Sequence, residues 1–534
     1  MTNYLWNTPE KLRALLCELV SWDSRTLTEG EVTFAPKLEA KLTRLSYFQE
    51  NPNHLELHDA GLGRQTVTAL YKHPEATETI VLISHFDTVQ TEEYGVLEAL
   101  AFNPEELTRK LHDHKDELPE QARIDLETGK YLFGRGTMDM KMGLALHIAM
   151  IEKASIEQWP INLLLTTVPD EEVNSAGMRV AVSELVRLRE VHGLTYKLFL
   201  NGEPSFSQGP EDNKEYIYSG TIGKIMPSAL FYGKETHVGE PMRGITANYI
   251  ASFLTQRMEW NPLFSESDLG ETTPLPVSLQ QKDLKAQYST QTPYRAAALY
   301  NVFLFKRTAD EVMDLFEQVA MEAMDECSAA YQAVCDREQV KGVGNPRVIR
   351  YEELLTYATE KLGQEEVERL KNTVLDNIEA DDRELCIEIV DNLMIQCQEL
   401  APATVIFYAP PYYPAVNTSD NPLVKESIAL VQKEASKFDL ELDQIHYFNG
   451  ICDLSYVNYE DDGDGWVAFE RNTPVWGDTY SIPFNEMAEL SAPVLNVGPF
   501  GKDAHQRTER LQVDSAFVEM PQMIEALIRN MFKE

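Results

Sequence analysis

The chain has 534 residues, of which 86 are acidic and 47 basic, so its formal net charge is −39. This surplus of acid excludes nucleic acid or an anionic membrane as the main partner, because phosphate groups attract Lys and Arg. Hydrophobic residues make up 43% of the chain, which is typical of a globular protein with more than one domain. The six cysteines form no CxxC pair, and we find neither a signal pattern nor a run of about eighteen apolar residues. We therefore expect a cytoplasmic protein with free thiols.

The first part of the chain alternates predicted helices with predicted strands. Residues 8–23 and about 36–48 have apolar side chains at helical spacing, and residues 65–71 are rich in β-branched side chains. Residues 79–84 form an apolar run of the kind that is buried in a parallel sheet. This alternation predicts an α/β fold, in which reactive side chains gather at the carboxyl ends of the strands.

A histidine and an aspartate follow directly on the strand at 79–84. His85 and Asp87 are two residues apart, so they would share a face if the strand continued. Asp87 could then accept a hydrogen bond from the ring N–H of His85 and turn the other ring nitrogen toward a metal ion. The alternative is a loop histidine with an ordinary hydrogen-bond partner.

A polar, acidic segment at 91–130 is followed by a glycine-rich turn that contains Asp139. Gly134 and Gly136 favour a tight turn, and the apolar residues of 144–150 have helical spacing. A carboxylate between a turn and a helix is held rigidly, so both of its oxygens can point at fixed metal positions. The alternative is that Asp139 only caps the helix.

Acidic residues also follow the next two predicted strands. Strand 161–168 precedes Glu171 and Glu172, and strand 196–200 precedes Glu203. Adjacent glutamates point in different directions, so one can bind a metal ion while the other serves as a general base. The alternative for the pair is an acidic helix N-terminus, which the helix dipole favours.

These motifs and a late histidine occur in the order of a known family. They are His85-Phe-Asp87, Gly134-Arg-Gly-Thr-Met-Asp139, Glu171-Glu172, Gly202-Glu203-Pro204 and His505. The set resembles the dizinc aminoacylase, carboxypeptidase and dipeptidase family, metallopeptidase family twenty, and within it the RocB branch associated with arginine utilisation. The resemblance covers about 1–330 and 400–534. It implies a zinc-peptidase-like catalytic domain with a mostly parallel central sheet and an inserted α+β lid.

The sequence changes character after Ser219. A β-rich stretch at 220–233, a helix at about 245–257, a strand at 301–307 and a helix near 309–325 predict a separate α/β module. The resemblance implies that this module is the lid and carries the contact of a homodimer.

Two residues of this module match lid positions that hold substrate in the family, namely His237 and Arg307. Thr246 stands where the family usually has Asn, which puts one substrate contact in doubt. For His237 the alternative is an ordinary surface histidine.

Residues 328–400 depart from the family pattern. The part from Glu352 to Leu400 has strong helical spacing and no catalytic motif, so we interpret it as an insertion that enlarges the lid or a subunit interface. The predicted domains are therefore a catalytic domain at 1–219 and 401–534, and a lid at 220–400.

The last part of the chain is predicted to complete the catalytic domain. It begins with a strand at 403–408 and an amphipathic helix at 421–438. The acidic residues of 459–466 lack the spacing of a calcium loop and predict an exposed loop. A strand at 493–497 precedes His505, and a helix follows at about 515–532.

The resemblance implies a co-catalytic pair of divalent metal ions, most simply zinc, with manganese or cobalt as alternatives. Asp139 would bridge the two ions. His85 and Glu203 would complete the first site, and Glu172 and His505 the second.

The implied reaction is hydrolysis of an amide or peptide bond of a small substrate. Glu171 would take a proton from the attacking water, Asp87 would orient His85, and His237 would help stabilise the oxyanion. Arg307 suggests a substrate carboxylate, as in an N-acyl amino acid, a dipeptide or an arginine derivative. The alternative is a catalytically silent metal-binding or regulatory protein on the same fold.

Overall fold

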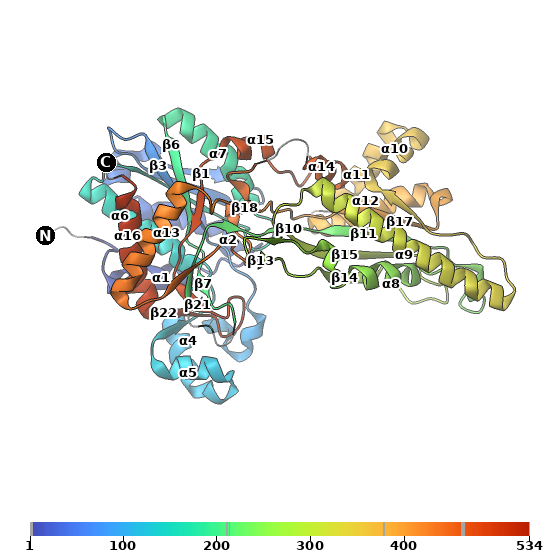
Figure 1. Cartoon of the computed structure of the whole chain (residues 1–534), viewed down its shortest axis with the longest axis horizontal. Helices are drawn as coiled ribbons and strands as arrows, with labels where there is room; N and C mark the ends of the chain where they lie inside the picture. The colour runs from blue at the N-terminus through green and yellow to red at the C-terminus, as the bar shows by residue number, and fades with distance from the viewer. Residues whose placement is uncertain (1–3, 210–211, 213, 378–379, 461–464, 533–534) are drawn as a thin grey trace. The chain divides into compact units, whose positions relative to one another are not determined.

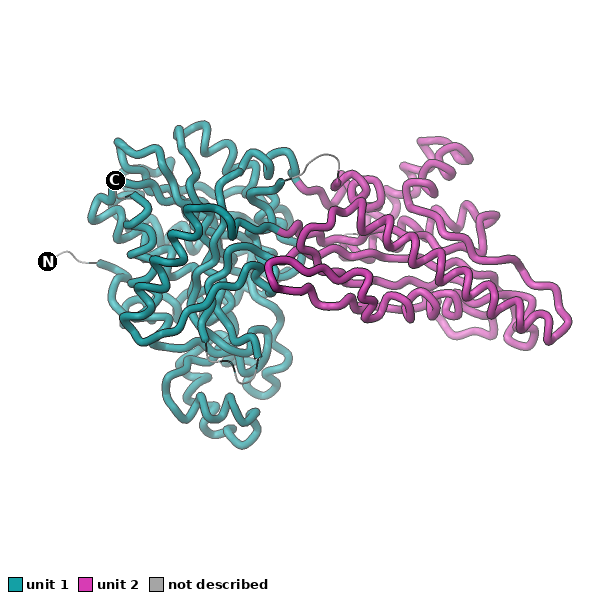
Figure 2. Tube along the Cα trace, in the orientation of Figure 1, with its two compact units in different colours: residues 1–221, 416–460, 483–534 teal, residues 222–415, 461–482 magenta. Residues whose placement is uncertain are grey.

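The computed structural model describes residues 4–532 except 210–211, 213, 378–379 and 461–464. The chain forms two compact units (Figure 2). Unit 1 comprises residues 1–221, 416–460 and 483–534, and unit 2 comprises residues 222–415 and 461–482. The expected domains differ from these units because 401–415 and 461–482 belong to unit 2. The acidic loop predicted at 459–466 lies partly outside the described residues.

Unit 1 is built on an eight-stranded mixed sheet whose centre is parallel. In spatial order its strands are β1 (Leu55–Asp59), β2 (Gln65–Tyr71), β5 (Asn162–Val168), β3 (Glu78–His85), β6 (Thr195–Asn201), β20 (Val494–Asn496), β8 (Glu215–Tyr218) and β19 (Leu442–Ile445). β3 pairs parallel with both β5 and β6, and β20 pairs parallel with β6. The carboxyl ends of these strands therefore meet at one edge of the sheet.

Helices of unit 1 pack on this sheet or on one another (Figure 1). They include α1 (Pro9–Ser21), α2 (Glu29–Leu42), α3 (Ser46–Glu50), α6 (Lys141–Glu157), α7 (Ala176–His192), α13 (Pro422–Ala435), α15 (Phe484–Glu489) and α16 (Met520–Asn530). The helix predicted at 36–48 is instead the pair α2 and α3. Phe34 and Leu38 of α2 are fully buried, and this packing outweighs the disruption by Pro36.

A second, four-stranded sheet of unit 1 carries the last part of the chain. In order its strands are β4 (Tyr131–Phe133), β22 (Arg510–Gln512), β21 (Phe500–Lys502) and β7 (Ser205–Phe206). β21 and β22 form an antiparallel hairpin, which the sequence did not predict. The excursion before β4 contains η2 (Glu92–Leu100), α4 (Pro104–Leu111), η3 (His112–Glu117) and α5 (Glu120–Thr128). These elements enclose a small hydrophobic core of their own.

Unit 2 contains a sheet flanked by helices. Its strands are β10 (Gly223–Ile225), β15 (Arg295–Leu304), β11 (Pro227–Tyr232), β17 (Ala403–Tyr408) and β16 (Arg347–Arg350), with β14 (Val277–Asp283) on β15. Its longer helices are α8 (Ala247–Met258), α9 (Ala309–Glu338), α10 (Tyr351–Leu362), α11 (Gln364–Leu375) and α12 (Asp382–Gln396). α9 is the long yellow helix of Figure 1 and packs against α8. The helical spacing predicted after Glu352 corresponds to α10, α11 and α12.

The strand at 403–408 was predicted correctly but was assigned to the wrong part of the protein. β17 pairs antiparallel with β11 and parallel with β16, both of which belong to unit 2. All six of its residues are buried, because it has a strand on either side and helices against its faces. A strand that is buried on both faces has a continuous apolar sequence, and this pattern does not indicate which sheet the strand will join.

Candidate metal centre

Three parallel strands bring histidine and glutamate side chains to one edge of the unit 1 sheet. His85 is the last residue of β3, Glu171 and Glu172 follow β5, and Glu203 follows β6. Asp139 lies just before α6, at the end of its glycine-rich turn. A side chain at Gly143 would collide with the backbone of Gly202, so a glycine is needed where α6 crosses the segment that carries Glu203.

The first group of side chains surrounds the ring of His85. Its Nε2 atom lies 3.3 Å from Oδ1 of Asp139, 3.4 Å from Oε1 of Glu203 and 3.7 Å from Oε2 of Glu171. The His85 side chain is 1% exposed, so water does not screen these contacts. The arrangement brings three carboxylates to a single imidazole nitrogen.

The second group surrounds His505, which lies in the loop between β21 and β22. Its Nε2 atom is 3.1 Å from Oδ2 of Asp139 and 3.1 Å from Oε2 of Glu172. Asp139 thus belongs to both groups, and each of its oxygens faces a different histidine. All five residues predicted as metal ligands lie together in unit 1.

The distances within both groups fit ligands that share a metal ion. Two atoms that bind one tetrahedral zinc ion at about 2.0–2.1 Å lie about 3.3–3.4 Å apart. The contacts of Asp139 and Glu203 with His85 measure 3.3 Å and 3.4 Å, and those of His505 measure 3.1 Å. Imidazole and carboxylate are donors that zinc binds in proteins. The side chains therefore fit two adjacent divalent cations.

The crowding of acids shifts the pKa values of both kinds of side chain. Burial alone would lower the pKa of His85, but the charges of Glu171 and Glu203 raise it well above its ordinary value. Burial raises the pKa of Glu203 to about 8 and raises those of Glu171 and Glu172. A divalent cation reduces the repulsion between buried carboxylates more than a singly charged imidazolium does.

Asp87 has a different set of partners from the predicted one. Nδ1 of His85 lies 3.2 Å from the carbonyl oxygen of Asp87 and 3.5 Å from its carboxylate. The Asp87 carboxylate accepts hydrogen bonds from the backbone N–H groups of Glu171 at 3.1 Å and Glu172 at 3.2 Å, and from the Thr26 hydroxyl at 2.8 Å. The hydrogen bonds of the Asp87 carboxylate therefore stabilise the turn that carries Glu171 and Glu172.

Sequence reasoning gave no role to one acidic residue beside this centre, although the loop at 448–455 that carries it resembles a family loop near the site. Asp453 begins the short helix η8 (Asp453–Tyr456), and its side chain is buried. Burial raises its pKa to about 7, and its charge in turn helps to raise the pKa of Glu171. The signal in the sequence was a lone acid inside the apolar run from Ile451 to Leu454.

The two predicted substrate residues, His237 and Arg307, lie in unit 2. His237 is exposed, and its Nδ1 accepts a hydrogen bond from the backbone N–H of Gly239 at 3.0 Å. The backbone N–H of Arg307 donates to Glu266 at 3.0 Å. Thr246 caps α8 by accepting a hydrogen bond from the N–H of Tyr249, which gives this residue a structural role.

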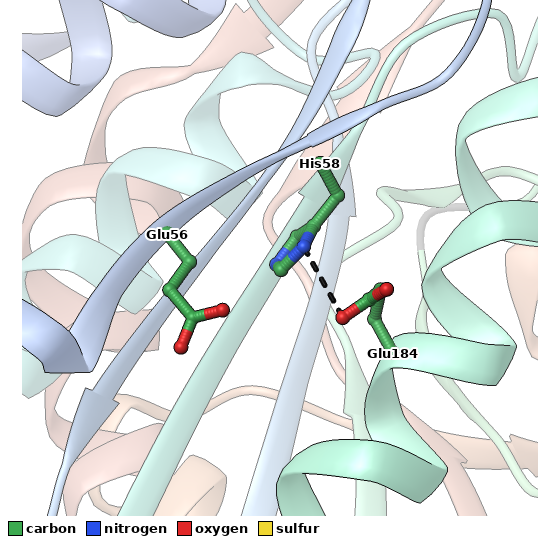
Figure 3. A group of neighbouring side chains, drawn as sticks. All are labelled: Glu56, His58 and Glu184. Atoms are coloured by element: carbon green, nitrogen blue, oxygen red, sulfur yellow. Dashed lines mark ion pairs between the residues drawn. The ribbon is translucent and has the colours of Figure 1, made fainter.

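A further histidine with two carboxylates lies on the outer strand β1 and helix α7 (Figure 3). Nδ1 of His58 is 3.3 Å from Oε2 of Glu184, and Glu56 lies nearby. Arg187 forms ion pairs with both carboxylates, and Nε2 of His58 is 2.8 Å from the Thr68 hydroxyl. Because these partners already satisfy the charges, we interpret this group as an ion-pair network and not as a metal site.

Comparison with known proteins identifies the family of this chain. The profile of Peptidase family M20/M25/M40 matches residues 81–460. This chain belongs to that family. YqjN of Bacillus subtilis (strain 168) is 40% identical over 536 residues, which cover 99% of this chain and 98% of YqjN. Protein RocB of the same organism is 31% identical over 544 residues, 97% of this chain and 94% of RocB.

Solved structures show the same fold. Aminopeptidase PepT from Bacillus cereus superposes with a TM-score of 0.55 at 15% identity, over 99% of this chain and 100% of that chain. The predicted family and the predicted α/β class are therefore confirmed. As a member of family M20/M25/M40, this chain is a hydrolase of amide or peptide bonds in small substrates. Among the described residues, no helix is both long enough and apolar enough to cross a membrane.

Proposed function

We propose that unit 1 hydrolyses its substrate with two divalent metal ions that Asp139 bridges. The observation that carries this proposal is that Oδ1 of Asp139 lies 3.3 Å from His85, while Oδ2 lies 3.1 Å from His505. His85 and Glu203 would complete the first site, and Glu172 and His505 the second. The donors suit zinc, and manganese and cobalt accept the same ligand types.

When bound, such a pair of ions lowers the pKa of a water molecule toward about 7 and polarises the scissile carbonyl. The chain itself supplies the proton transfers. Glu171 would accept the proton of the attacking water and then deliver it to the leaving amine. The backbone N–H of Glu171 donates a hydrogen bond to the Asp87 carboxylate at 3.1 Å. This contact fixes the turn that carries the proposed base. Asp87 would thus act by positioning Glu171 and His85.

The substrate we propose is an N-acyl amino acid, a dipeptide or a related derivative, including one of arginine. His237 would stabilise the oxyanion, and Arg307 would bind a substrate carboxylate. The Arg307 role is supported by its Nη1 atom, which is buried and makes no hydrogen bond to the described residues. A guanidinium with an unused N–H pair is well shaped for a carboxylate.

We also propose that unit 2 joins two copies of the chain into a homodimer. Strand β14 lies at the edge of its sheet, and among the described residues it pairs only with β15. Large apolar side chains are exposed on this strand and near it, namely Trp260, Leu263, Leu275 and Leu279. An edge strand with exposed apolar side chains is a surface that a second copy can cover.

Three measurements test this proposal. Elemental analysis should give two divalent metal ions per chain, and the loaded protein should hydrolyse at least one member of a panel of N-acyl amino acids and dipeptides. Metal without turnover on any panel member would favour the catalytically silent alternative. Sedimentation analysis should give a dimer, which Leu279→Lys should weaken while leaving the metal content unchanged.

A further inference from the structure

The side chain of His505 is less buried than those of the other four candidate ligands. The His505 side chain is 48% exposed, whereas that of Asp139 is 15% exposed and those of His85, Glu172 and Glu203 are less exposed still. The backbone φ of His505 is +63°, a conformation that persists for a side chain other than glycine only when its surroundings hold it. Contacts outside the loop must therefore fix this histidine.

The first such contact is a buried ion pair that joins the loop to the turn of Asp139. Nη1 of Arg135 lies 2.5 Å from Oε2 of Glu509, and their side chains are 1% and 0% exposed. The backbone N–H of Gly134 also donates to the carbonyl oxygen of Glu509 at 3.1 Å. Arg135 lies four residues before Asp139, and Glu509 lies four residues after His505. The pair therefore links the chain segments of two ligands that face each other.

The second contact closes the base of the hairpin. Lys502 and Arg510 are opposite each other in the pairing of β21 with β22. Oδ2 of Asp125, on α5, lies 3.0 Å from Nζ of Lys502 and 2.8 Å from Nη2 of Arg510. Arg510 also pairs with Asp503 inside the loop, and Asp503 accepts a hydrogen bond from the Thr508 hydroxyl at 2.7 Å. One carboxylate from outside the hairpin thus holds both of its strands.

The segment before β4 provides several of the outside contacts. Asp125 belongs to it, Glu93 of the same segment pairs with Arg135, and the carbonyl oxygen of Glu117 accepts a hydrogen bond from Arg507 of the loop. Its helices α4 and α5 (Figure 1) have their own core and supply none of the candidate metal ligands. This segment therefore contacts two parts of the chain that carry candidate ligands, the His505 loop and the Asp139 turn.

We propose that residues 92–128 and the ion pair of Arg135 with Glu509 together form a bracket that positions His505 for the second metal ion, with Asp125, Arg135 and Glu509 as the positioning residues. This inference rests on the proposed function. Buried partners that orient a metal ligand commonly change metal affinity by 10–100-fold when they are mutated. The bracket also contacts the turn of Asp139, which both sites share. It should therefore affect the site of Asp139, Glu172 and His505 more strongly than the site of His85, Asp139 and Glu203.

The test compares Asp125→Asn and Glu509→Gln in the full-length chain by titration with zinc in competition with a chelator. His505→Ala defines the isotherm of a chain whose second site is lost. Both bracket variants should shift this same binding step most, to a dissociation constant about 10–100-fold higher. Glu525→Gln is the matched control, because it breaks the ion pair of Lys153 with Glu525 between α6 and α16 and should change neither step.

A second readout needs no metal ion. Arg507 is exposed in the loop, so trypsin should cut after it faster in Asp125→Asn than in the wild type or Glu525→Gln. Circular dichroism identifies variants that fail to fold, and Glu509→Asp replaces Glu509→Gln in that case. Folded bracket variants with wild-type zinc affinities and wild-type cleavage would overturn the bracket, as would equal weakening of both sites. A wild-type chain that binds no zinc would instead overturn the proposed function, and the cleavage rates would still decide whether the bracket holds the loop.

Discussion

Nη1 of Arg64 lies 2.6 Å from Oδ1 of Asp170, and the two side chains are 7% and 3% exposed. Asp170 stands immediately before the two glutamates, with a backbone φ of +68°, and its Oδ2 accepts a hydrogen bond from the N–H of Ala176 at 3.0 Å. The ion pair therefore fixes the turn that presents Glu171 and Glu172. Its basic partner, Arg64, directly precedes β2 and belongs to none of the predicted catalytic motifs.

Arg64→Ala should destabilise the protein strongly, because it leaves the Asp170 carboxylate buried without its partner. The expected loss is about 3–5 kcal/mol in the free energy of unfolding. Arg189→Ala is the comparison, since its ion pair with Glu489 is largely exposed and should contribute less than about 1 kcal/mol. Urea denaturation of both variants measures the difference. Equal stability of the two would show that the Arg64 pair does not hold the turn.

Asp139→Ala should lower the metal content of both proposed sites, because Asp139 belongs to both groups of ligands. His505→Ala should lower the content of one site, since its Nε2 atom faces Asp139 and Glu172. Elemental analysis after dialysis against a weak chelator distinguishes the two patterns. Full metal content in the Asp139 variant would rule out a bridging carboxylate.

Glu171→Gln should keep both metal ions and the fold but lose hydrolysis. The amide has nearly the same shape as the carboxylate, yet it cannot accept a proton. A positioned general base contributes about 10²–10⁴-fold to the rate, so kcat should fall by that factor. Single-turnover kinetics together with metal analysis would check this. Near-normal turnover would assign the proton transfer to another group.

His237→Ala should lower kcat while the metal content stays unchanged, if the imidazole reaches the oxyanion of a bound substrate. Its ring now accepts a hydrogen bond from Gly239, so the exchange removes no buried contact. Stability should therefore match the wild type within about 0.5 kcal/mol. An unchanged kcat would return His237 to the alternative of an ordinary surface histidine.

Glu215 should make the stability of unit 1 depend on pH. Burial and the charge of Glu519 raise its pKa from the ordinary 4.5 to about 7. Between these two values the folded chain keeps a proton that the unfolded chain has lost, so this residue lowers stability as pH rises. Glu215→Gln has no charge to bury and should exceed the wild type by about 3 kcal/mol or less at pH 8, with a smaller difference at pH 5.5. A difference that does not grow with pH would contradict the raised pKa.

Residues at or shortly after the end of an apolar strand were among those that the sequence could predict. His85, Glu172 and Glu203 are such residues, and the parallel strands before them place them together. The pair of Arg135 with Glu509 could not be predicted, because 374 positions separate the two residues and each charge has many equivalent partners in the sequence. Strand 403–408 shows the same limit, since its spacing indicates a strand but not its neighbours.

The position of β20 also has a consequence for the order in which the protein is made. This strand lies between β6 and β8 in the large sheet, although almost three hundred residues separate it from β6. A ribosome therefore releases all of unit 2 before the middle of the unit 1 sheet can close, and His505 emerges only after that. A nascent chain would hold most of its metal ligands without a complete site. Closing the sheet in this order requires a long loop, which favours slow folding.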